Sequence, residues 1–246
     1  KLIIIIFKYL ESKVNIKLIG LLIMLLYSAS LSAGIKFNPI QLNIQDFKRQ
    51  KSTTVNIEST GLSKSKIYEV NAFKWQQDEK GEDVLVEDRT LLFNPKTFEL
   101  KPESKQIVRI GFSQPPENLE KQQSWRVVFK EVTPVVEESA INFLFNFSLP
   151  LFAGKVVPPK LSVDLHKINN VAYLNIINSE NSFAKITEVV VLDNKNNELL
   201  RQDLALYVLS GNKIKFELGE IKTGNIAKLK IKLDEQAGYL EFPVKG

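Results

Sequence analysis

Hydrophobic and polar residues alternate with a period of two along INFLFNFSLPLF, residues 141–152. The large apolar side chains that share one face are Ile141, Phe143, Phe145, Phe147 and Leu149. The positions between them are mostly polar, so the pattern predicts a β-strand with one covered face and one partly solvated face. Two interpretations are open. The segment is either a core strand of its own sandwich or a strand that lends its apolar face to another chain.

The segment follows a series of shorter strand patterns that are separated by turn residues such as Thr60-Gly61 and Asn94-Pro95. The predicted strands are Ile35 to Ile44, Thr53 to Glu58, Ser65 to Trp75, Leu91 to Phe93, Gln106 to Phe112, Trp125 to Glu131 and Asn142 to Phe152. Seven short strands in about 120 residues are typical of an immunoglobulin-like sandwich. Trp75, on an apolar-rich strand, is interpreted as a packing residue of this first sandwich.

Two adjacent prolines, Pro158 and Pro159, interrupt the strand patterns. Proline fixes φ and lacks an N–H donor, so we expect a short, semi-rigid linker there. Strand patterns then resume at Leu161 to Leu165, Val171 to Asn178, Phe183 to Leu192, Leu204 to Leu209, Asn212 to Leu218, Ala227 to Leu233 and Gly238 to Pro243. The sequence therefore predicts an all-β protein with two sandwich domains, residues 34–154 and 155–246.

Residues 1–33 differ from the rest of the chain. Lys13 and Lys17 precede an apolar run over residues 18–27, and small residues follow up to Ala33. This order predicts a secretory signal peptide that is cleaved near Ala33, because the apolar run is short for a membrane span. A further apolar stretch at residues 2–7 leaves an uncleaved membrane anchor as the alternative.

The composition excludes several kinds of chemistry. The chain has no cysteine and a single histidine, His166, so it has no disulfide, thiolate site or multi-histidine metal site. Without residues 1–33, 29 basic residues face 27 acidic ones, and the two signs are interspersed, which gives nucleic-acid binding little support. No phosphate-binding glycine motif is present. We therefore expect no catalytic residue, no cofactor and no metal.

Several spaced pieces of the chain together resemble one protein family. They are YEVNAFKWQ at 68–76, LLFNPKTFELKPESKQIVRIG at 91–111, SWRVVFKEVTP at 124–134, NFSLPLF at 146–152 and YVLSGNKIKFEL at 207–218. In their order and spacing these pieces resemble the periplasmic chaperones of pilus assembly by the chaperone-usher pathway, in particular its archaic branch. The resemblance implies two immunoglobulin-like domains joined in an L shape and a periplasmic location.

The resemblance also implies a mode of binding. Such chaperones insert a strand into a pilus subunit that lacks one, and then deliver the subunit to an outer-membrane usher. The donated side chains would be Ile141, Phe143, Phe145, Phe147 and Leu149, which we call the donor ridge. An unpaired ridge of this kind promotes aggregation, so we expect the free chain to cover it by self-association or with the acidic stretch near Glu137 and Glu138.

In this family, basic side chains also hold the C-terminal carboxylate of the subunit. The usual pair is missing here, because Asn38-Pro39-Ile40 and Leu149-Pro150-Leu151 stand where the better-known branch has basic residues. The candidate replacements are Arg89, Arg109, Arg126, Lys36 and Lys155. For each of them, a solvated side chain or an ordinary ion pair with a nearby acid is the alternative interpretation.

Two other classes of function are weighed against a chaperone. The chain can be a secreted or anchored two-domain adhesion or structural module, in which the donor ridge stays paired within its own domain. A hydrolase built on a β-sandwich is disfavoured, because His166 would have to serve as the base and lies in a stretch typical of a surface residue.

Overall fold

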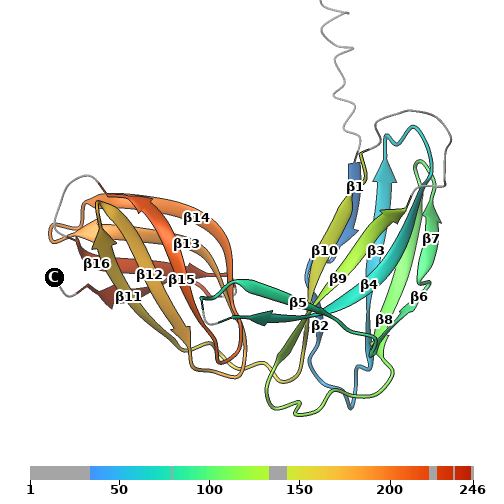
Figure 1. The fold of residues 1–246 in the computed structure, drawn as a ribbon, viewed down its shortest axis with the longest axis horizontal. Coiled ribbons are helices and arrows are strands. Elements are labelled where there is room, and N and C mark those ends of the chain that lie inside the picture. Colours follow the sequence, from blue (N-terminus) through green and yellow to red (C-terminus); the bar gives the residue numbers. More distant parts are fainter. Residues whose placement is uncertain (1–33, 79, 133–142, 222–225, 235, 245–246) are drawn as a thin grey trace, which may run out of the picture.

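The computed structural model describes residues 34–78, 80–132, 143–221, 226–234 and 236–244. These residues are all-β and form two sandwiches that diverge from a shared junction, which gives the molecule a bent shape (Figure 1). The prediction of two immunoglobulin-like sandwiches is confirmed. No helix in the described part of the chain has the length and apolar character needed to cross a membrane.

The first sandwich contains two sheets. Its strands are β1 (Gly34–Asn38), β2 (Leu42–Ile44), β3 (Ser52–Thr60), β4 (Lys66–Gln77), β5 (Asp83–Glu87), β6 (Leu91–Asn94), β7 (Thr97–Leu100), β8 (Lys105–Phe112), β9 (Gln123–Val132) and β10 (Asn146–Ala153). One sheet has the order β1-β3-β8-β6. The other has the order β2-β10-β9-β4-β5, with β7 also paired to β4.

Alternation along these strands builds the core of the first sandwich. Val127 and Phe129 of β9 are buried together with Val70 of β4, which is their neighbour in the sheet. From the facing sheet, Val55 and Val108 close the same core. Successive side chains in a strand point to opposite faces, so the intervening residues of β9, such as Arg126, lie on the outer face.

Three features of the first sandwich differ from the strand prediction. The predicted strand from Ile35 to Ile44 is two strands, because the chain leaves β1 after Asn38 and joins the other sheet as β2. Strands β5 and β7 are additional. The strand that carries the donor ridge begins only at Asn146, so it is shorter than predicted.

The second sandwich packs a three-stranded sheet, β11-β12-β15, on a four-stranded sheet, β14-β13-β16-β17 (orange and red in Figure 1). Its strands are β11 (Leu161–Ile168), β12 (Val171–Asn178), β13 (Ala184–Asp193), β14 (Glu198–Val208), β15 (Lys213–Glu220), β16 (Ile226–Leu233) and β17 (Tyr239–Pro243). The core includes Leu174 and Ile176 of β12, which face Ile186 and Val189 of β13.

Aromatic side chains join the two sandwiches. The cluster contains Trp75, Phe152 and Leu209, with Phe183 and Tyr207 packed against them. The Phe152 and Phe183 rings stack with centroids 3.7 Å apart, and Tyr207 meets the Trp75 ring edge-on at 5.3 Å. Trp75 is therefore a packing residue, but the interpretation that assigned it to the first sandwich is only half correct, because Trp75 packs at the domain junction on Phe152 of the first sandwich and Tyr207 of the second.

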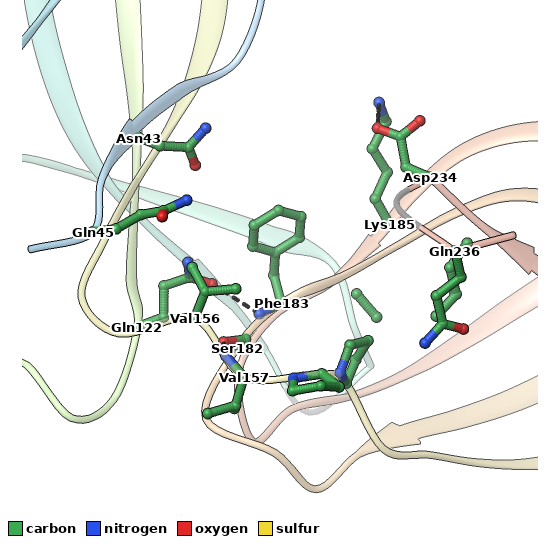
Figure 2. A pocket seen from close by; sticks show the side chains of 14 residues that line it. Asn43, Gln45, Gln122, Val156, Val157, Ser182, Phe183, Lys185, Asp234 and Gln236 are labelled. Atoms are coloured by element: carbon green, nitrogen blue, oxygen red, sulfur yellow. Dashed lines mark hydrogen bonds and ion pairs between the residues drawn. The ribbon is translucent and has the colours of Figure 1, made fainter.

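Polar contacts fix the same junction. The Gln77 side chain donates to the Tyr207 carbonyl at 2.8 Å and accepts from the Leu209 amide at 2.9 Å. Gln122 Oε1 accepts from the Phe183 amide at 3.0 Å, the contact drawn as a dashed line in Figure 2. Because these bonds join backbone of one domain to side chains of the other, they define the orientation of the two sandwiches as well as their contact.

A cavity of about 240 Å³ lies beside this junction. Figure 2 shows Asn43 and Gln45 from the β2 side of the cavity and the Lys185–Asp234 pair from the second domain. The lining is an apolar floor that includes Phe183, ringed by carboxamides and one ion pair.

Candidate functional site

One edge of β10 is open along most of its length. On one side, β10 pairs with β9 from Asn146 to Ala153. On the other side, it pairs with β2 only from Leu151 to Ala153. Within the described residues, the other edge of β10 from Asn146 to Pro150 therefore has no neighbouring strand. An unpaired strand edge presents backbone donors and acceptors to which another strand can bind.

The donor ridge divides into an exposed part and a buried part. Phe143 and Phe145 precede β10 and are 79% and 56% exposed. Phe147 is half-buried, and Leu149 is only 7% exposed and belongs to the core of the first sandwich. Ile141 lies outside the described residues, as do Glu137 and Glu138. Of the described ridge residues, only Phe143 and Phe145 are thus accessible without rearrangement.

Phe147 marks the transition between the two parts. Its ring centroid lies 4.7 Å from that of Phe37 on β1 and 6.2 Å from that of Tyr68 on β4. Strand β1 is itself the edge strand of the facing sheet. The Phe37–Phe147 contact therefore closes the sandwich at the side where both sheets end in an open edge.

The candidate anchoring cations lie on separate elements. Lys36 is on β1, Arg109 on β8 and Arg89 between β5 and β6, while Arg126 is on β9 and Lys155 follows β10. Three of them are exposed and already have short-range partners. Arg89 bonds Glu87 at 3.1 Å, Arg109 donates to Ser52 Oγ at 2.8 Å, and Lys155 lies 3.3 Å from Glu120. The structure thus does not gather the five into one cluster.

Arg126 differs from the other candidates because it lies at the domain junction. Its guanidinium stacks 3.7 Å from the Trp75 ring centroid and lies 3.6 Å from the Asp83 carboxylate. Burial lowers the pKa of Arg126, while the charge of Asp83 acts in the opposite direction. Arg126 is thus held between the aromatic cluster and β5, and it contributes a fixed positive charge on the outer face of β9.

Two further charged residues, Lys74 and Asp88, contact Trp125 of β9, and sequence analysis did not single them out. The Trp125 indole N–H donates to Asp88 Oδ2 at 2.9 Å, and Lys74 Nζ lies 3.7 Å from the Trp125 ring centroid. Burial raises the pKa of Asp88, but hydrogen bonds from Thr90 and Trp125 outweigh it, so this pKa lies below its usual value. The individual residues are ordinary in sequence, and only the pairing of β4 with β9 brings Lys74 and Trp125 together.

We expect Lys74 to make stability depend on pH. Burial lowers the pKa of Lys74 to about 8 in the folded protein, although the nearby Asp88 carboxylate acts against this shift. The unfolded chain keeps this proton up to a pKa of about 10.4. Between these values the unfolded state binds more protons, so stability rises with pH through this window. Between pH 7.5 and 9.5, the midpoint temperature of thermal unfolding should rise less with pH for Lys74→Met than for the wild type. Parallel curves would contradict the prediction.

His166 lies on β11 of the second sandwich, where its ring stacks on Tyr173 and its Nδ1 lies 3.4 Å from the Asn175 amide. The described residues hold no group of three or more His, Asp or Glu side chains arranged to bind a metal ion. His166 thus has the contacts of a residue on a sheet face.

Comparisons with known proteins identify the fold. Neither a protein-family model nor a curated protein matches the chain. Among solved structures, the chain is similar to the complex of chaperone CsuC with tip adhesion subunit CsuE from archaic Csu pili of Acinetobacter baumannii. The match has 20% identity and a TM-score of 0.64, and it covers 86% of this chain and 98% of the other.

Two further structures agree. The complex of the SafB chaperone with SafA pilin from Salmonella enterica matches at 12% identity with a TM-score of 0.58, covering 88% of this chain and 99% of the other. The periplasmic chaperone SfaE matches at 15% identity with a TM-score of 0.53, covering 86% and 99%. The chain therefore has the fold of the chaperones of chaperone-usher pilus assembly, and the resemblance seen in the sequence is confirmed at the level of the fold.

Proposed function

We propose that the chain is a non-enzymatic periplasmic chaperone that binds pilus subunits by donating a strand and delivers them to an outer-membrane usher. The observation that carries the proposal is the pair of exposed phenylalanines, Phe143 and Phe145, immediately before the open edge of β10. A subunit strand that pairs with this edge gains backbone hydrogen bonds, and its apolar groove receives the side chains of the ridge.

The division of the ridge indicates which part does the binding. Burying a large apolar side chain contributes about 1.5–3 kcal/mol, so Phe143 and Phe145 together would contribute about 3–6 kcal/mol before ordering costs. Phe147 and Leu149 already pack in their own sandwich. In this proposal Phe147 and Leu149 support the donated strand from behind, and the exposed end, extended by Ile141, enters the groove of the subunit.

The proposal also includes how the C-terminal carboxylate of the subunit is held and how the chain covers its ridge when no subunit is bound. Arg126 and Lys155 are the anchor candidates nearest the end of β10, since Arg126 neighbours Pro150 in the sheet and Lys155 follows Ala153 by two residues. Lys36, Arg89 and Arg109 remain candidates on other surfaces. In the free chain, self-association would cover Phe143 and Phe145 until a subunit binds.

The test is capture of a pilus subunit encoded in the same gene cluster, co-expressed with the chain in the periplasm. We expect Phe143→Asp and Phe145→Asp each to reduce co-purification at least about tenfold, because each removes about 1.5–3 kcal/mol of apolar burial and places a charge in the groove. Both should fold normally, since both sites are solvated. Circular dichroism and thermal unfolding check this.

Ile107→Asp is the matched control. Ile107 lies on β8 in the facing sheet and is 57% exposed, nearly the same as Phe145. The control should leave capture unchanged. Full capture by both phenylalanine variants would refute strand donation and favour an adhesion or structural module whose ridge stays within its own domain.

A further inference from the structure

The pairing of β9 with β10 ends in an unusual way. The regular register stops at Asn146 opposite Lys130. At the next position, the Glu131 amide donates to the Phe145 carbonyl at 3.2 Å, as in an ordinary ladder. The Phe145 amide, however, donates to Glu131 Oε2 at 3.1 Å. A side-chain carboxylate thus takes the place of a backbone carbonyl at the point where the exposed ridge begins.

The Glu131 carboxylate is buried, and each of its oxygens has a separate partner. Oε1 accepts from Lys66 Nζ at 2.6 Å, while Oε2 accepts from the Phe145 amide. The same Lys66 Nζ lies 5.4 Å from the Phe145 ring centroid. One buried ion pair therefore contacts both the backbone and the ring of Phe145. A buried carboxylate is stable only with partners of this kind.

The neighbour of Glu131 on β4 supplies no negative charge. Tyr68 lies opposite Glu131 in the β4–β9 register, and its buried hydroxyl has no hydrogen-bond partner among the described residues. Burial and the Glu131 charge both raise the pKa of Tyr68, so the phenol stays neutral. Glu131 also lines a cavity of about 250 Å³, together with Phe143, Leu144 and residues 62–66.

We propose that Glu131 is a positioning residue that holds the start of the donor ridge in its binding conformation. The inference rests on the proposed strand donation. The carboxylate fixes the backbone at Phe145, which keeps Phe143 and Phe145 outside their own sandwich. Fixing a binding segment in its bound conformation improves affinity because less conformational entropy is lost on association. Lys66 completes the arrangement by neutralising the buried charge.

The decisive variant is Glu131→Gln. A carboxamide has a single acceptor oxygen, so Lys66 and the Phe145 amide must compete for it. Hydrogen bonds to charged groups are stronger than those between neutral groups, so we expect amide hydrogen exchange at Phe145 to accelerate about tenfold or more. Capture of the co-expressed pilus subunit should weaken about threefold to tenfold, the range for ordering one or two residues.

A double variant separates positioning from general damage. In Glu131→Gln with Lys66→Met, the lysine no longer competes and the carboxamide oxygen is free for the Phe145 amide. Both Phe145 protection and subunit capture should return toward the wild-type values. Glu188→Gln is the matched control. Glu188 is a buried, ion-paired glutamate like Glu131, but its partner is Arg201 and it lies in the second sandwich. It should change neither measurement.

Unchanged exchange at Phe145 in Glu131→Gln would overturn the inference, as would faster exchange with full capture. These outcomes differ from failure of the proposed function. If Phe143→Asp and Phe145→Asp capture subunits normally, strand donation is wrong. The exchange at Phe145 in the free chain would then still show whether Glu131 fixes this backbone, and only its role in binding would fall.

Discussion

Phe152→Ala is expected to lower the free energy of unfolding by about 3–5 kcal/mol, the usual cost of removing a buried phenylalanine ring. The variant should also uncouple the two domains. Phe152 belongs to β10 of the first sandwich, but its ring stacks on Phe183 and lies 5.9 Å from Tyr207, both in the second. Its loss leaves a void between the two sandwiches.

Differential scanning calorimetry distinguishes these two effects. Phe98→Ala is the matched control, because Phe98 is a buried ring of the first sandwich that packs against Tyr68 and Phe129, away from the junction. Phe98→Ala should destabilise the first sandwich by a similar amount without changing the unfolding transition of the second sandwich. Phe152→Ala should instead separate the unfolding transitions of the two sandwiches. A loss below about 1 kcal/mol with a single unfolding transition would contradict a junction held by this ring.

The junction also explains a limit of sequence analysis. Alternation along residues 66–77 places Tyr68, Val70 and Ala72 on the core face and Trp75 on the opposite face, yet Trp75 is buried. Alternation does not reveal whether another domain covers the outer face of a strand. Trp75 lies on the face opposite the core of its own sandwich and is covered by Tyr207, more than a hundred residues away in the chain. Only the meeting of the two sandwiches decides this contact.

The strands that sequence analysis found and missed follow the same logic. Long strands with one fully buried face, such as β4 and β9, alternate clearly and were predicted. Strand β5 is exposed at all five positions, so no burial pattern marks it. It exists because β4 is long enough to pair with it. Strand β7 is only four residues long, which is the shortest run over which a period of two indicates a strand.

The candidate site shows a similar division. The donor ridge was visible in the sequence because five apolar residues share one period. The sequence could not divide the ridge into an exposed and a buried part, since the division depends on where β9 ends. Glu131 and Lys66 carry no pattern of their own, and they meet only because β4 and β9 are neighbours.

Leu149→Asp tests this division of the ridge, and we expect it to prevent stable folding of the first sandwich. Leu149 is in the core, so the variant loses about 1.5–3 kcal/mol of apolar burial and buries an unpaired carboxylate at a cost of several kcal/mol. Because whole domains are stable by about 5–15 kcal/mol, this sum removes most of the stability. Circular dichroism and thermal unfolding measure the effect.

Leu149→Met is the control, because it keeps the volume and should cost less than about 1.5 kcal/mol. Phe145→Asp, four positions earlier on the same ridge, should change stability by about 0.5 kcal/mol or less, as is usual for exposed sites. The contrast between Leu149→Asp and Phe145→Asp follows from one boundary, the end of the β9 ladder at Asn146. If Leu149→Asp folded normally but lost subunit capture, β10 would leave its own core on binding, and the donated strand would extend through Leu149.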